Sequence, residues 1–157
     1  LAQILKRSAG KLRVDLQEDA ANEIACRSRG TPRIANNRLL WIRDFAESRA
    51  DGNISFQVAC SAMQMAGIDS LGLDRQDRGY LETLIRVFAG GPTGIESIAH
   101  TMNASVDTLS DEVEPFLLRS ELVVRTPRGR IATAKAFTHL NLGQPTSPGG
   151  PDDPMPF

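Results

Sequence analysis

The sequence has few of the residues that most often carry chemistry. Its 157 residues include two cysteines, two histidines, one tryptophan and one tyrosine. Cys26 and Cys60 lie among apolar residues of helical pattern, so we expect buried thiols of a cytoplasmic protein rather than disulfides or metal ligands. His100 and His139 are isolated from any cysteine or carboxylate at the spacing of metal ligands, so no metal site is expected.

Other absences narrow the function further. No apolar run is long enough to span a membrane, and no membrane partner is expected. A Ser/His/Asp order, paired catalytic carboxylates and a Rossmann fingerprint are missing, and so is the phosphate loop GxxxxGK(S/T). The chain alone is therefore not expected to hydrolyse a nucleotide, and no catalytic residue is expected in it. Because it starts at Leu1 inside a helical pattern, we expect the C-terminal portion of a longer protein.

The charged residues balance over the whole chain but not locally. Eighteen lysines and arginines stand against 19 carboxylates, a formal net charge of -1, so no overall field favours nucleic acid. Residues 119–135 differ, because four arginines and one lysine stand there against the single carboxylate of Glu121, a local charge of +4. A basic surface is therefore expected only locally.

Helical periodicity predicts a mainly α-helical chain with two domains and a tail. Gly67 and Gly72 break the helical period, and we place the domain boundary there, after residue 70. Residues 141–157 consist largely of Gly, Pro, Ser and Asp and are expected to be disordered. Residues 1–70 predict four helices with short connections, over 1–9 (ended by Gly10), 18–28, about 32–49, and one capped by Ser55.

Residues 71–140 predict a winged helix, which is a helix-turn-helix with an added β-hairpin wing. Pro115 falls inside the third predicted helix and is expected to kink it. The predicted elements are helices over about 74–89 and 95–102, a third helix capped by Asp107, strands over 122–125 and 131–133 around the turn Thr126-Pro127-Arg128-Gly129, and a last helical turn over 135–140.

The turn Gly30-Thr31-Pro32-Arg33 organises the first domain. Gly30 ends one helix, Thr31 can cap the next, and Pro32 suits its first position, which puts Arg33 in the first turn of the long helix. A cation is unfavourable there by a few tenths of a kcal/mol, up to roughly 1, because of the helix dipole. Two interpretations stay open: a solvated arginine, or an arginine that binds a phosphate together with free backbone N–H groups.

The hairpin arginines Arg125, Arg128 and Arg130 are the candidate DNA ligands. They flank one tight turn, and only Glu121 is expected to lie near enough to neutralise them. Guanidinium forks suit phosphate oxygens, and a wing can lie along a groove. The alternative is a solvated edge hairpin whose cations prevent edge pairing.

The third predicted helix, which would read bases in a helix-turn-helix, is acidic. Carboxylates that face DNA are unfavourable, so we predict a domain that binds the DNA backbone without reading sequence. The carboxylates in question are Asp107, Asp111, Glu112 and Glu114.

Several motifs together resemble the RuvB family of Holliday-junction branch-migration motors. The most specific are Gly30-Thr-Pro-Arg-Ile-Ala-Asn36 and Arg125-Thr-Pro-Arg-Gly-Arg130, in that order. One departure is Asn37 before Arg38, where the family continues with arginine and leucines; it is either a substitution or a one-residue slip. The supporting motifs, which extend the resemblance over residues 1–140, are Arg43-Asp-Phe-Ala46, Gly72-Leu-Asp74, Gly90-Gly-Pro92 and Glu114-Pro-Phe-Leu117.

The resemblance implies an AAA+ lid followed by a winged helix, both behind an N-terminal ATPase domain outside this chain. It implies a hexameric, ATP-driven DNA helicase that branch-migrates Holliday junctions in recombination and repair, with a RuvA-type junction-recognition subunit as partner. ATP would be the cofactor, with Mg²⁺ held by the missing domain. Arg33 matches the family's nucleotide-sensing arginine, and Arg125 and Arg130 match its DNA-contacting wing residues, with Arg128 between them.

Two other functions stay open on the residues alone. One is a non-enzymatic winged-helix transcription regulator with a helical dimerisation domain. It would give Thr31-Pro32-Arg33 no purpose, and the acidic third helix argues against sequence reading. The other, a helical protein-interaction adaptor, leaves the arginine-rich hairpin unexplained.

Overall fold

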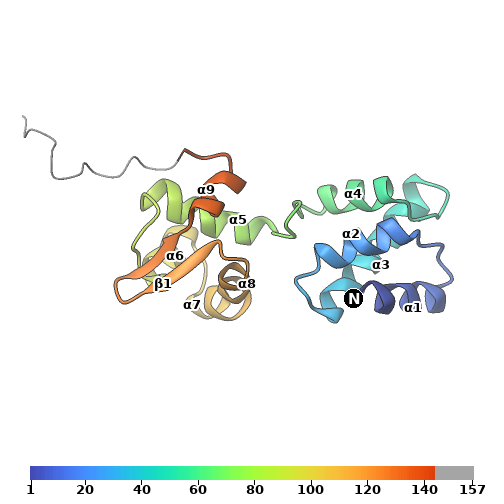
Figure 1. Ribbon diagram of the computed structural model, residues 1–157, viewed down its shortest axis with the longest axis horizontal. Helices are drawn as coiled ribbons and strands as arrows, with labels where there is room; N and C mark the ends of the chain where they lie inside the picture. Colours follow the sequence, from blue (N-terminus) through green and yellow to red (C-terminus); the bar gives the residue numbers. More distant parts are fainter. Residues whose placement is uncertain (144–157) are drawn as a thin grey trace, which may run out of the picture. The chain divides into compact units, whose positions relative to one another are not determined.

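A computed structural model describes residues 1–143. They form two compact units that divide after Arg75, and each unit is described by itself (Figure 1). No helix in this range is long and apolar enough to cross a membrane. The predicted disordered tail lies outside the described residues from position 144 onward. Asn141 and Leu142, which the prediction included in the tail, donate backbone hydrogen bonds to the carbonyls of Thr138 and Phe137, at 3.1 and 2.9 Å.

The first unit is the expected four-helix unit. Each helix turns an apolar face inward, and a parallel bridge between Leu16 and Ile54 joins the segments that lead into the second and fourth helices. The helices are α1 (Ala2–Leu12), α2 (Glu18–Cys26), α3 (Pro32–Arg49) and α4 (Phe56–Met65). Their shared core comprises Leu5, Ala9, Ala20, Ile24, Ala35, Leu39, Ile42, Ala46, Ile54, Ala59, Ala62 and Met63.

Two details of the first unit differ from the sequence-based expectation. Gly10 does not end α1, which continues to Leu12 and ends at Arg13 in the left-handed conformation. A glycine inside a helix costs only about 1 kcal/mol relative to alanine, which the packing of Leu5 and Ala9 on the core outweighs. Nor are the cysteines buried: Cys26 is exposed and Cys60 half-buried, because the inward face of α2 runs through Ala20, Ala21 and Ile24.

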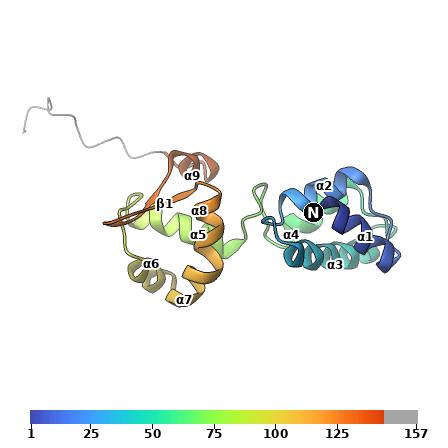
Figure 2. The same ribbon diagram turned by 60° about the horizontal axis from the view of Figure 1, so that its bottom comes forward.

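The second unit has the predicted winged-helix order (Figures 1 and 2). Its two strands pair antiparallel, with Val123 opposite Ala132 and Arg125 opposite Arg130. The elements are α5 (Arg75–Glu82), a π-helical turn η1 (Thr83–Val87), α6 (Ile95–Met102), α7 (Val106–Thr108), a second π-helical turn η2 (Leu109–Val113), α8 (Glu114–Arg119), β1 (Val123–Thr126), β2 (Gly129–Ala132) and α9 (Ala134–His139). Fully buried side chains include Tyr80, Leu81, Leu84, Ile98, Leu109, Leu117 and Leu122.

The third predicted helix is built differently from the expectation. Ser105, not Asp107, caps it, because the Ser105 hydroxyl accepts the Thr108 N–H at 3.1 Å. The helix then widens into η2, and a new α-helical segment, α8, begins at Glu114 with Pro115 in its first turn. Proline has no N–H to donate and fixes its own φ near the helical value, which suits the first turn of a helical segment. The wider π turn thus takes the place of a simple kink.

The loop before α6 supports the hairpin from its other edge. Thr93 and Arg130 exchange backbone hydrogen bonds of 2.7 and 3.1 Å, and the Ala132 N–H donates to the Gly90 carbonyl at 2.9 Å. The approach is so close that a Cβ on Gly91 would lie 2.1 Å from the Arg130 carbonyl oxygen. The backbone of Arg130 is therefore held on both sides.

Candidate functional site

The turn that carries Arg33 has the predicted position but not the predicted cap. Thr31 is the N-cap residue of α3 and Pro32 its first residue. The Thr31 hydroxyl does not cap the helix and instead donates to the Arg29 carbonyl at 3.3 Å. The Arg33 side chain is exposed and makes no polar contact within residues 1–143. The free helix start and a free guanidinium thus lie together, as an anion site needs.

The same turn is fastened to the segment that leaves the first unit. Arg29 forms an ion pair with Asp74, at 3.4 Å between Nη2 and Oδ2. Gly72 has φ +86°, and a Cβ there would lie 2.5 Å from the Arg27 carbonyl oxygen, so only glycine fits. The turn that carries Arg33 and the segment before α5 are therefore a single packed element of the first unit.

Arg38 is buried in α3 and has an unusual environment. Its side chain is 8% exposed, Nη2 donates to the Gly72 carbonyl at 3.3 Å, and Nη1 has no partner within the described residues. Burial, with the nearby cations Arg29 and Arg27, lowers the pKa of Arg38 to about 10. Helix α3 is α-helical from Pro32 to Arg49, and Arg38 lies on its buried side.

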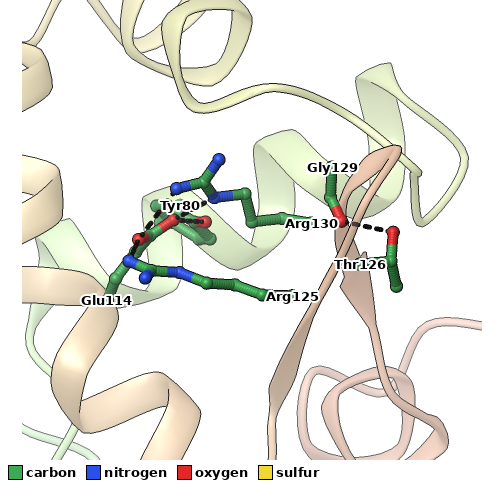
Figure 3. Close-up of polar contacts among 6 residues, drawn as sticks. All are labelled: Tyr80, Glu114, Arg125, Thr126, Gly129 and Arg130. Atoms are coloured by element: carbon green, nitrogen blue, oxygen red, sulfur yellow. Dashed lines mark hydrogen bonds and ion pairs between the residues drawn. The ribbon is translucent and has the colours of Figure 1, made fainter.

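The hairpin arginines do not form the free cluster that the sequence suggested. Arg125 and Arg130 both turn inward to the carboxylate of Glu114 (Figure 3). Arg125 Nη2 lies 2.6 Å from Oε2, and Arg130 Nε lies 2.7 Å from Oε1. The prediction that only Glu121 could neutralise these arginines was therefore wrong. Sequence distance hid the partner, because Glu114 reaches the hairpin only after α8 and β1 fold together.

Glu114 is completely buried and accepts a further hydrogen bond from the Tyr80 hydroxyl at 2.7 Å. Burial by itself would raise the pKa of the Glu114 carboxyl, but the hydrogen bonds from Arg130, Arg125 and Tyr80 outweigh it and lower the pKa. The hydrogen bond to Glu114 likewise raises the pKa of Arg130, and burial raises that of Tyr80. Glu114 and Arg130 are thus charged at neutral pH, whereas Tyr80 is neutral. Glu114 is buried and does not lie on the exposed acidic face of the third helix that the sequence predicted.

The three hairpin arginines differ in how much of each is free. The Arg130 side chain is 20% exposed and the Arg125 side chain 54% exposed. Arg128, at the turn, is exposed and its guanidinium has no polar contact in the part of the chain that the structure describes. Thr126 shapes that turn, because its hydroxyl donates to the Gly129 carbonyl at 2.8 Å. Arg128 and the outer part of Arg125 are the surfaces available to a phosphate.

The other carboxylates of the third helix lie where they were expected. Asp107, Asp111 and Glu112 are exposed. Sequence reasoning missed Glu114 and Tyr80 as members of the hairpin site. The sequence did hold a signal for the burial of Glu114. Among the carboxylates of this helix, Glu114 lies three residues before Leu117 and so shares a helix face with that buried residue.

Fold and site together define a class of protein: a small helical lid with an exposed arginine at a helix start, joined to a winged-helix domain with a basic hairpin. Comparisons with known proteins give the same division. A family described as "RuvB AAA lid domain" matches residues 1–69, and one described as "RuvB C-terminal winged helix domain" matches residues 70–141.

Similar proteins and structures carry the same name. The Holliday junction branch migration complex subunit RuvB of Rhodopirellula baltica is 60% identical over 94% of this chain and 40% of its own length. That of Mycobacterium avium is 51% identical over 100% of this chain and 45% of its own. The solved structure of the Thermotoga maritima RuvB Holliday junction branch migration motor superposes with a TM-score of 0.87 at 41% identity, covering 92% of this chain and 48% of that one.

The chain belongs to the RuvB family, of which it contains the AAA lid and the C-terminal winged helix domain. It spans 40 to 45% of the length of the curated relatives described above. Family membership favours the motor over the transcription regulator and the adaptor.

Proposed function

We propose that this chain is the nucleotide-sensing and DNA-contacting part of an ATP-driven motor that branch-migrates Holliday junctions. The observation that carries the proposal is the presence, in one RuvB-type chain, of two exposed arginines whose guanidinium groups have no polar partner among residues 1–143: Arg33 at a helix start and Arg128 at the wing turn. A guanidinium at a helix N-terminus suits a nucleotide phosphate, and one on a wing suits a DNA phosphate.

The remaining parts of the motor would lie outside this chain. ATP and Mg²⁺ would be bound mainly by an N-terminal ATPase domain, since the sequence has no phosphate loop. Arg33 would reach the nucleotide phosphates from the lid. Copies of the subunit would form a hexamer, and a RuvA-type subunit would recognise the junction. The 157-residue chain alone is expected to show no ATP turnover.

DNA binding by the wing is tested with the 157-residue chain and its Arg128→Ala variant in a salt series. Each phosphate contact releases counterions, so log affinity falls with log salt by about 0.9 per contact. Arg128→Ala is expected to weaken binding to two unrelated duplexes and a four-way junction alike and to flatten the slope by roughly 1.

Arg7→Ala is the matched control, because Arg7 is an exposed arginine of α1 and its loss changes the net charge equally. A loss confined to one duplex would indicate base reading and favour the regulator. Equal affinity of wild type and Arg128→Ala would contradict the role of the wing turn, and ATP turnover by the purified chain would contradict the division of labour.

A further inference from the structure

Two like charges face each other on the hairpin. Arg125 and Arg130 are direct partners in the antiparallel ladder, so their side chains leave the same face of the hairpin. Like charges directly opposite one another destabilise a strand pair. The carboxylate of Glu114 lies between them and binds both, which converts a repulsive pair into a bridged one.

The carboxylate also ties the hairpin to the helices. Tyr80 from α5 and Glu114 from α8 meet Arg125 from β1 and Arg130 from β2 at one point (Figure 3). Arg130 gives Glu114 both Nε and Nη2, the latter at 3.4 Å, and its backbone is fixed by Thr93. These bonds restrain the hairpin relative to the helices.

Arg125 uses only one of its guanidinium nitrogens to bind Glu114. Its Nη2 binds Glu114, whereas Nε and Nη1 have no polar partner within residues 1–143 and the side chain is 54% exposed. An arginine whose one branch is fixed presents the other N–H groups in a fixed direction at little entropy cost.

We propose that Glu114 is a positioning residue for DNA binding: it holds Arg125 and Arg130 so that the free N–H groups of Arg125 face a backbone phosphate. This inference rests on the proposed function above. Glu114 is completely buried and touches no DNA itself, and Tyr80 fixes the carboxylate from the side of α5.

The sign of one charge change tests the proposal. Glu114→Gln removes a negative charge from a DNA-binding domain, which by long-range electrostatics alone would tighten DNA binding. Positioning predicts the opposite: about tenfold weaker binding to duplex DNA, the value of one charge-assisted hydrogen bond, and a salt slope lower by about 1. Glu121→Gln is the matched control, because Glu121 is exposed, makes no side-chain contact with the hairpin arginines, and gives the same charge change. It is expected to leave affinity unchanged or slightly tighter.

A second variant covers the case in which Glu114→Gln does not fold. Tyr80→Phe keeps every charge and removes one donor to Glu114, and about threefold weaker DNA binding is expected, in line with a neutral hydrogen bond. In the Arg125→Ala background, either substitution is expected to cost no further affinity. If Glu114 had a purely structural role, these substitutions would lower the melting temperature without changing the salt slope. Their effect on DNA affinity would then be the same with and without Arg125.

The outcomes separate the two proposals. The proposed function would be overturned if the wild-type chain did not bind DNA, or if its affinity for DNA did not depend on salt. A salt-dependent wild type together with a folded Glu114→Gln that binds DNA as tightly as wild type or tighter would overturn the positioning role alone. Unchanged DNA affinity of Tyr80→Phe would overturn it as well.

Discussion

The half-buried Arg130 of the winged helix and the buried Arg38 of the lid are stabilised in opposite ways. Arg130 of the winged helix meets a buried carboxylate, and its pKa is raised. The side chain of Arg38 in the lid donates to a single backbone carbonyl and its Nη1 has no partner among the described residues, and its pKa is lowered to about 10. Removing the partner of a buried charge is costly. A buried charged side chain with few hydrogen-bond partners, in contrast, can be replaced by an apolar residue of similar size at little cost. Burial of an arginine is therefore no measure of its worth to the fold.

Exposed arginines complete the comparison, and the largest effect is expected at one of them. In a full-length RuvB subunit with this lid, Arg33→Ala is expected to lower ATP turnover by up to about 10³-fold, the low end of the effect of arginines on transferring phosphoryl groups. The melting temperature of the lid should stay unchanged, because Arg33 has no polar contact within residues 1–143. Steady-state hydrolysis near the wild-type rate would show that this arginine does not sense the nucleotide.

The second effect separates Arg130 from Arg128. Arg130→Met is expected to destabilise the winged helix by about 3 kcal/mol, because it leaves Glu114 buried with one arginine fewer. Arg128→Met, the same substitution two residues away at the exposed turn, should change stability by under about 0.5 kcal/mol. Urea unfolding of both variants measures the difference, and equal stabilities would show that the Glu114 network contributes nothing.

The third effect is a loss of stability of the winged helix at acidic pH. The pKa of Glu114 is lowered in the folded state below its ordinary value of 4.5. The unfolded chain then binds more protons, so this contribution to stability is complete above about pH 4.5 and is lost as the pH falls through the folded pKa. Thermal unfolding of the winged helix from pH 7 to 3 should show this loss in wild type and a smaller one in Glu114→Gln. Parallel curves would contradict the ionised network.

The smallest effect is expected to be a gain. Arg38→Met should stabilise the lid by about 1 kcal/mol, because it removes a buried charge that lacks a carboxylate partner. Arg43→Met, on the same helix but beside Asp44 at 2.9 Å, is the control and should be nearly neutral. A loss of more than 1 kcal/mol in Arg38→Met would show that the bond to the Gly72 carbonyl outweighs the cost of burial.

The sequence predicted local features well and long-range pairing poorly. The start of α3 at Pro32, the Ser55 cap of α4 and the hairpin turn each follow from a few adjacent residues, and all three are confirmed. The bonds of Glu114 to Arg125 and Arg130 join residues 11 and 16 positions apart on three elements, and no local pattern encodes them. The nucleotide role of Arg33 and the DNA role of Arg125, Arg128 and Arg130 stay predictions.

The errors have a common physical origin. A helical period locates an apolar face but not which polar residue is drawn into it, so the burial of Arg38 was not foreseen and Glu114 was assigned to the wrong environment. Gly10 and Pro115 were given their usual effect as helix breakers. In α1 the core packing overrides the glycine, and before α8 the π turn accommodates the proline.

The scarcity of aromatic residues gives each unit its own optical reporter. Trp41, the only tryptophan, lies in the lid, where Nε1 donates to the Ala62 carbonyl at 2.9 Å and joins α3 to α4. Tyr80, the only tyrosine, lies in the winged helix with its hydroxyl on the Glu114 carboxylate. Indole emission therefore reports on the packing of α3 against α4, and phenol emission reports on the bonds around Glu114. One unlabelled sample can report on the unfolding of both units.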